Sequence, residues 1–291
     1  MMSTRATYLL AVVGLLAATT AQGATLPLGS WQLVTNPTNY TGGSGTTITP
    51  GVDTSSFTLS NTDAGFTTGT GFFTTFDPYT LGDTFGVGEK IRLSFDMTID
   101  ASDSYSNNSF RFGLYNHNGN APETDALNWL GYMVHAASPS GSQGEIMSRS
   151  TANANPYASG SGADSLPRNT TVGPTDSLRG GNYSVLMELT LASATEVGLA
   201  VSIIGEDTDQ NPYEWATSIQ DLHEFQPGQT TFDRLGFQLT GAAGGVTDSI
   251  AFSNVTISVV PEPSSVALAL GALAGMALVV QRKRSALRVG S

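Results

Sequence analysis

The chain has no cysteine and few basic residues, with only 12 lysines and arginines among 291 residues. Without cysteine no disulfide can stabilise the fold and a thiolate zinc site is excluded, so stability has to come from core burial. Acidic residues number 24, for a net charge of −12; four basic residues lie in the last ten positions, and the body between the two ends is more acidic still, at about −16. Such a body repels phosphate backbones, and we expect no nucleic-acid partner.

Histidine and the common catalytic motifs are also scarce. The three histidines, His117, His135 and His223, show no paired-ligand spacing. There is no Gly-x-Ser-x-Gly elbow and no phosphate-binding Gly-x-x-x-x-Gly-Lys loop. The sequence therefore predicts no catalytic residue and no cofactor by motif. His117 or His135 acting as a base with a distant serine stays open.

The first 23 residues have the pattern of a secretory signal peptide. Arg5 supplies a positive start, residues 9–18 form an apolar segment, and Ala21-Gln22-Gly23 is a small-x-small cleavage site. We expect a signal helix over 1–23 that signal peptidase removes, with a cut after Ala21 as the alternative. The rest of the chain is then exported.

The C-terminal 32 residues combine three parts in a fixed order. Pro261-Glu262-Pro263 keeps the backbone extended, residues 264–280 form an uncharged apolar run, and Arg282, Lys283 and Arg284 follow. At about 1.5 Å per residue this run makes a helix of roughly 25 Å, a minimal transmembrane span. The basic end predicts that residues 285–291 form a cytoplasmic tail.

This tail, residues 260–284, resembles a PEP-CTERM sorting signal, the bacterial tail read by an exosortase. The resemblance implies that an exosortase-type membrane protease cuts near Pro261-Glu262-Pro263 and passes the body to the cell surface or the exopolysaccharide matrix. The alternative is a plain C-terminal membrane anchor that happens to follow the motif. Mutation of Glu262 separates the two, because a plain anchor does not depend on it.

Between the ends, residues 24–259 predict one all-β domain. Residues 91–100, 110–115 and 251–259 alternate apolar and polar side chains, which is typical of strands with one buried face. Less regular β-type segments lie at residues 56–59, 72–76, 129–135, 183–191, 197–204 and 232–239. About a dozen strands without an amphipathic helix predict a two-sheet antiparallel β-sandwich, with a closed barrel as the alternative.

Two stretches interrupt this series. Residues 42–45 are Gly-Gly-Ser-Gly and predict a flexible connector. Residues 136–181 are crowded with Ser, Gly, Asn and Pro, and a loop of that length is unusual inside a compact domain. We therefore expect a short strand hidden at residues 145–149.

The body also resembles other exported proteins with this tail. The segments at 73–99, 110–116, 233–239 and 249–258 are similar in order and spacing to those of PEP-CTERM surface proteins, which are similar to concanavalin A-like lectin and glucanase jelly rolls. The resemblance implies a jelly-roll sandwich. The Glu-x-Asp-x-x-Glu strand that carries the paired catalytic carboxylates of glucanases on this fold is absent.

Two groups of residues are candidates for binding. Sugar rings stack on exposed aromatic side chains, and the glycan-binding candidates are Tyr157, Tyr213 and Trp215 in loop-like sequence and Trp129 and Tyr132 on a predicted strand. Ordinary core packing is the alternative for each. The acidic run with Glu206, Asp207 and Asp209 offers oxygen ligands suited to Ca²⁺, and a solvated turn is the alternative there.

These observations leave two hypotheses. The first is a non-catalytic surface or matrix protein that contacts exopolysaccharide. The second is an exported glycan-active hydrolase or lyase on the same sandwich, which requires two carboxylates, a His–Tyr pair or a His–Arg pair in a groove across one sheet.

Overall fold

The computed structural model describes residues 23–34, 46–61, 70–101, 110–119, 126, 129–136, 145–149, 164–165, 169–172, 178, 180–221, 230–239 and 247–261. Residues 1–22 of the predicted signal peptide, the predicted sorting signal from residue 262 on, the connector at 42–45 and Tyr157 lie outside these ranges. Within them no helix is long and apolar enough to cross a membrane.

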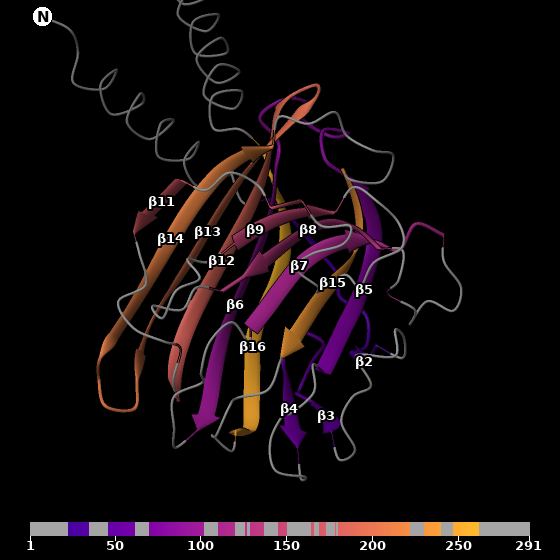
Figure 1. The fold of residues 1–291 in the computed structure, drawn as a ribbon. Coiled ribbons are helices and arrows are strands. Elements are labelled where there is room, and N and C mark those ends of the chain that lie inside the picture. Colours follow the sequence, from indigo (N-terminus) through magenta and orange to yellow (C-terminus); the bar gives the residue numbers. More distant parts are fainter. Residues whose placement is uncertain are drawn as a thin grey trace, which may run out of the picture.

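The described strands form two antiparallel sheets (Figure 1). One sheet has nine strands, in the order β11 (Asn169–Val172), β14 (Pro212–Asp221), β13 (Glu196–Asp207), β12 (Gly181–Ser193), β6 (Lys90–Ala101), β16 (Thr247–Val260), β4 (Phe57–Asn61) and β3 (Thr46–Pro50), with β1 (Ala24–Leu26) also paired to β16. The other has seven, in the order β10 (Asp164–Ser165), β9 (Glu145–Arg149), β8 (Leu130–His135), β7 (Phe110–Asn116), β15 (Thr231–Leu239), β5 (Thr70–Thr80) and β2 (Gln32–Leu33).

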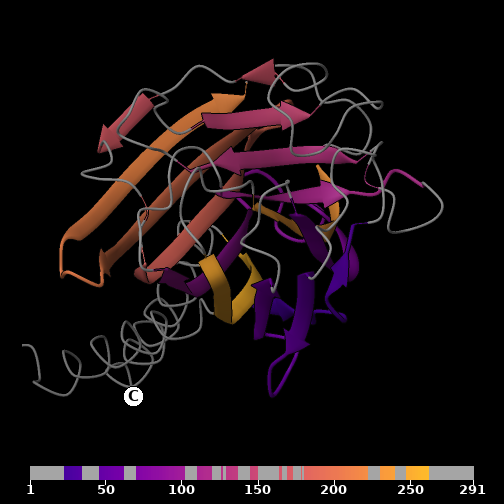
Figure 2. The same cartoon turned by 60° about the horizontal axis from the view of Figure 1, so that its bottom comes forward.

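The predicted sandwich is thereby confirmed, and the closed barrel is wrong, because the strands separate into two sheets rather than one continuous ring. Figure 2 shows the sheets as two layers, with the magenta strands β7 and β8 crossing over the orange strands β12 to β14. The hidden strand predicted at residues 145–149 is β9, with those same bounds.

Alternation along β6 explains how the nine-stranded sheet divides core from solvent. Ile91, Leu93 and Phe95 are buried, as are Met97 and Ile99, whereas the intervening residues are half-buried or exposed. β12 follows the same pattern over most of its length. Because successive side chains of a strand point to opposite faces, one face of this sheet lines the core and the other is wet.

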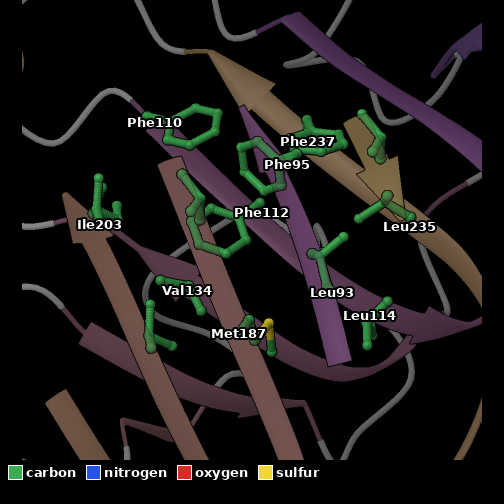
Figure 3. Close-up of a cluster of buried hydrophobic side chains, with 14 of the residues drawn as sticks. Leu93, Phe95, Phe110, Phe112, Leu114, Val134, Met187, Ile203, Leu235 and Phe237 are labelled. Atoms are coloured by element: carbon green, nitrogen blue, oxygen red, sulfur yellow. The ribbon is translucent and has the colours of Figure 1, made fainter. Parts of the chain in front are cut away.

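The central strands of the seven-stranded sheet are largely buried on both faces. Its inner face meets the nine-stranded sheet, and Figure 3 shows Leu93 and Phe95 lying among Phe112, Leu114 and Phe237. Phe95 and Phe112 meet edge to face with ring centroids 5.4 Å apart. Its outer face carries a second cluster formed by Val34, Phe73, Tyr115, Ala126, Trp129, Met133 and Met147. β8 is therefore buried along its whole length, and its residues do not alternate between core and solvent.

Candidate functional site

The aromatic residues predicted to bind glycan from a loop lie in a strand instead. Tyr213 and Trp215 belong to β14, so the prediction of loop positions for them is wrong. Trp215 has no exposed surface and Tyr213 is 2% exposed, and both belong to the core between the sheets. Burial raises the pKa of the Tyr213 hydroxyl, and the neighbouring Tyr183, 5.8 Å away between ring centroids, adds to this. Neither ring presents a face on which a sugar can stack.

The two strand candidates are also interior. Tyr132 lies on β8 and points into the core between the sheets. Trp129 immediately precedes β8 and packs in the outer cluster, 5.2 Å from Phe73 and 5.7 Å from Tyr115 between ring centroids. Core packing, the alternative weighed for each of them, describes both positions.

The acidic candidates for Ca²⁺ form the turn between β13 and β14. Asp207 accepts hydrogen bonds from the backbone N–H of Asp209 at 2.9 Å and of Asn211 at 2.8 Å, and from the Asn211 side-chain amide at 2.9 Å. Its carboxylate thus closes the hairpin, as an Asx turn does. Glu206 and Asp209 are exposed. Across the described part of the chain, no three His, Cys, Asp or Glu side chains gather where they could share a metal ion.

The outer face of the nine-stranded sheet carries a polar centre that the sequence analysis did not single out. Asp96 on β6 lies between Ser184 on β12 and Ser253 on β16 in the strand register. One carboxylate oxygen of Asp96 accepts a 2.6 Å hydrogen bond from the Ser184 hydroxyl, and the other accepts a 2.7 Å bond from the Asn254 amide. Three adjacent strands therefore contribute one connected group.

Asn254 reaches Asp96 because β16 is irregular at this point. The register with β6 shifts between Ser253 and Thr256, which marks a β-bulge, and Asn254 has the positive φ of 53°. Asparagine adopts this left-handed conformation more readily than other non-glycine residues, and bulges commonly re-aim a side chain. The bulge places Ser253 and Asn254 in succession on the exposed face, while Val255 turns into the core.

A groove runs across this face from Ser94 and Asp96 towards the β13–β14 turn. We call it the outer groove; it is lined by Asp96, Thr98, Asn182, Ser184, Ile204 and Asn254 among others, and its larger part has a volume of about 700 Å³. The Thr98 hydroxyl donates to the Asn182 side-chain oxygen at 2.8 Å. Ile204 is 55% exposed, an unusual position for a large apolar residue on a wet strand face. The groove thus combines hydroxyl, amide and carboxylate groups with one apolar side chain.

A His–Arg pair of the kind that the enzyme hypothesis requires lies on the outer face of the seven-stranded sheet, where much of it is buried. Arg111 lies directly opposite His135 in the register of β7 and β8, and donates to Gln238 at 3.2 Å. His135 is 5% exposed and Arg149 has no exposed surface. The Arg149 guanidinium donates to the Trp129 carbonyl at 3.1 Å. In this His–Arg pair His135 is buried and Arg111 is half-buried, and neither residue lines the outer groove.

A second histidine on that sheet is held by a carboxylate. The Asp233 carboxylate accepts a hydrogen bond from the backbone N–H of His117 at 3.0 Å and contacts its imidazole Nδ1. Arg234 contacts the same carboxylate at 3.2 Å, and its guanidinium lies over Phe73 and Trp129. These contacts tie the end of β7 to the bulge in β15. His223 lies outside the described residues.

Comparisons with known proteins do not assign a function, which therefore has to be argued from the residues described above. No family model and no curated protein sequence matches the chain. Among solved structures, the chain is similar to an alginate lyase from Aplysia kurodai, with 9% identity, a TM-score of 0.41 and coverage of 81% of this chain and 90% of the lyase. It is also similar to the carbohydrate recognition domain of Emp46p, with 11% identity, a TM-score of 0.41 and coverage of 79% and 88%.

A third similar structure is an endo-1,3-β-glucanase from Streptomyces sioyaensis, with 12% identity, a TM-score of 0.39 and coverage of 83% of this chain and 98% of the enzyme. Likenesses this distant carry no inference about a shared ligand or reaction.

Proposed function

We propose that the protein is an exported, non-catalytic surface or matrix protein that binds a glycan in the outer groove. The observation that carries this proposal is the group formed by Ser184, Asp96 and Asn254 in the outer groove, whose larger part, lined by Ser184 and Asp96, has a volume of about 700 Å³. Sugar hydroxyls both donate and accept hydrogen bonds, so they can pair with carboxylate, amide and hydroxyl groups alike. Ile204 supplies an apolar contact for the C–H face of a sugar ring.

The length of the groove favours an oligosaccharide over a single sugar. The lining residues on β6 extend from Ser94 to Thr98. At about 3.3 Å per residue this is roughly 13 Å along the strand, longer than one pyranose ring. Across the sheet the groove spans β6, β12 and β13, which adds roughly 10 Å at about 4.8 Å per strand.

The spacing of carboxylates in the groove favours binding over hydrolysis. Asp96 and Glu206 are separated by two strands and by two residues along the strands, because Ser184 pairs with Asp96 and Ile204, and Asn182 pairs with Thr98 and Glu206. This puts their Cα atoms roughly 12 Å apart on one sheet face, so hydrolysis would need the side chains to lean together until the carboxyl groups are about 5 Å apart for retention or about 6.5–9.5 Å apart for inversion. Both Asp96 oxygens are also already bonded to neutral donors.

Direct binding tests the proposal. Titration of the purified full chain in detergent against a panel of soluble polysaccharides is expected to give saturable binding. Asp96→Asn and Ser184→Ala are expected to weaken it about tenfold, since a hydrogen bond to a charged group is worth about 1.5–3 kcal/mol. Glu214→Gln is the matched control, because Glu214 is exposed on the same sheet outside the groove lining.

Two results would contradict the proposal. Unchanged affinity in Asp96→Asn and Ser184→Ala would show that the glycan binds elsewhere on the protein. Release of reducing ends or of unsaturated sugars from a polysaccharide, lost in a groove variant, would replace binding by the hydrolase or lyase alternative.

Export and sorting complete the proposal, with the signal peptide at 1–23 and the PEP-CTERM-type tail at 260–284 as the signals. These two signals are supported by the sequence and by the positions of the strands next to them. β1 begins at Ala24, β16 ends at Val260, and Ala24 pairs with Val259. The two ends of the sandwich thus leave it side by side, so both flanking segments can reach one membrane without unfolding the body.

Processing in cells tests the sorting signal. In a bacterium with an exosortase-type protease, the mature protein is expected to lack residues 1–23 and to end near Pro261. Glu262→Gln is expected to leave the C-terminal segment attached, as seen by intact mass, whereas Glu214→Gln is processed normally. Normal processing of the Glu262 variant would favour the plain membrane anchor.

A further inference from the structure

The charges that line the outer groove are of one sign. Asp96, Glu206 and Asp207 line it, and no lysine, arginine or histidine does so among the described lining residues. Asp207 is committed to the β13–β14 turn, and Glu206 is exposed. The carboxylate of Asp96 is therefore the charged group at the centre of the groove.

The nearest basic residues of the same strand are already paired. Lys90 and Arg92 lie on β6 before the groove begins and both contact Glu188, at 3.0 Å for Lys90. Glu188 neutralises only one of these two positive charges, so the three side chains together keep a net positive charge beside the groove. Neither cation lines the groove, so an anionic ligand there would meet no cation among the described lining residues.

These charges decide between two classes of glycan. The carboxylate of a uronic acid placed about 4 Å from Asp96 is repelled, which weakens binding about fivefold in bulk water and more at the lower effective dielectric constant near a protein surface. A neutral sugar meets no such repulsion, and its hydroxyls can donate to the Asp96 oxygens. Charged groups that oppose one ligand are a common source of specificity.

We propose that the outer groove selects neutral, hydroxyl-rich glycans over polyuronates and that Asp96 is the residue that sets this preference. The inference rests on the proposed glycan-binding function and names its ligand class. The negative charge of the groove then selects against acidic glycans. It also predicts that affinity for the neutral ligand changes little with salt, because no ion pair forms on binding.

Pairs of polysaccharides that differ only at C6 test the inference. β-1,4-Mannan with β-1,4-polymannuronate and β-1,4-glucan with β-1,4-polyglucuronate each compare CH₂OH with a carboxylate on the same backbone. Binding to the full chain in detergent is measured by calorimetry at low salt with EDTA present, which removes calcium bridging. In any pair that binds, the neutral member is expected to bind at least tenfold tighter than the acidic one.

Two variants locate the cause of the preference. Asp96→Asn is expected to reduce the ratio of neutral to acidic affinity at least threefold, because it removes the charge and keeps the shape. Ser184→Ala is expected to weaken both members and leave the ratio unchanged. Circular dichroism and melting temperature confirm that both variants are folded.

The possible results distinguish the preference for neutral glycans from glycan binding itself. Equal or tighter binding of a polyuronate, or an unchanged ratio in Asp96→Asn, would overturn the inference and leave glycan binding standing. Absence of binding to every polymer, or binding insensitive to both substitutions, would overturn the proposed function as well.

Discussion

At the residue scale, one buried carboxylate organises a whole loop. Glu89 has no exposed surface, yet it accepts hydrogen bonds from the backbone N–H of Gly82 at 2.9 Å and of Thr84 at 3.1 Å, and further bonds from the Phe85 N–H and the Tyr79 hydroxyl. Burial raises the pKa of Tyr79, and its bond to Glu89 adds to this. These bonds fix the turn between β5 and β6.

Replacing Glu89 should therefore cost stability. Glu89→Gln keeps the shape but turns one acceptor oxygen into a donor that faces backbone N–H groups. We expect the free energy of unfolding to fall by about 1–3 kcal/mol, the cost of leaving buried donors unsatisfied. Urea denaturation of the full chain measures this, with Asp83→Asn as control because Asp83 is exposed in the same loop. An equal midpoint for both variants would show that the loop does not depend on Glu89.

Glu188 should make stability depend on pH. Burial alone would raise the pKa of Glu188, but hydrogen bonds and charge from Lys90 and Arg92 outweigh it, and the pKa lies below its ordinary value. A carboxyl whose pKa is lower in the folded state stabilises the fold above its unfolded pKa, near 4.3, and this contribution is lost as pH falls through the folded pKa. The melting temperature should thus fall below about pH 4.3, less steeply in Glu188→Gln. Parallel profiles in the two proteins would contradict this.

The polar centre of the groove shows how far sequence reasoning reaches for single residues. Alternation over 91–100 predicts that Asp96 faces solvent, which the structure confirms. Its partner Asn254 lies 158 positions away and reaches it through a bulge in β16. A bulge depends on the register of two strands distant in sequence, which a single sequence does not specify. The aromatic candidates failed for a related reason, since side-chain burial depends on which strands become neighbours.

At the element scale, β14 shows why one long strand was missed. The run before it, residues 206–211, is acidic and polar, and Pro212 follows, so the sequence favours a loop. In the structure the turn is short, and β14 pairs with β13 from Pro212 to Asp221. Its inward positions include Thr217 beside Tyr213 and Trp215, which weakens the apolar alternation that marked β6. The nine-stranded sheet therefore contains a long strand that the sequence did not predict.

Two glycines on central strands should respond oppositely to the same substitution. A Cβ at Gly113 on β7 would lie 2.2 Å from the Tyr132 carbonyl oxygen of the paired strand, whereas at Gly198 on β13 its nearest neighbour, Thr190, is 3.9 Å away. Gly113→Ala should lower the free energy of unfolding by about 1–3 kcal/mol through overpacking. Gly198→Ala should be neutral or stabilise by about 0.4–1 kcal/mol, because alanine restricts the unfolded chain. Thermal and urea unfolding test both; equal effects would mean that β7 and β8 can separate freely.

At the scale of the whole molecule, the two ends of the sandwich meet at one edge of β16. β4 pairs with β16 over residues 249–252 and β1 pairs over residues 257–259, so among the described residues β1 alone covers this edge of β16 beside the proposed sorting motif. β1 also begins at Ala24, which is the first residue after the predicted signal-peptide cut. The position of that cut therefore decides whether the edge is covered.

A chain that begins at Pro27 should thus be less stable and self-associate. It lacks Ala24, Thr25 and Leu26, which pair with Val259, Ser258 and Ile257, and it leaves a row of unpaired backbone groups on β16. Uncovered strand edges are templates for pairing with another chain. Multi-angle light scattering should detect a concentration-dependent dimer that the chain beginning at Ala24 does not form, together with a lower melting temperature. A monomer of unchanged stability would mean that β1 contributes nothing to the sandwich and that the cut position is free to vary.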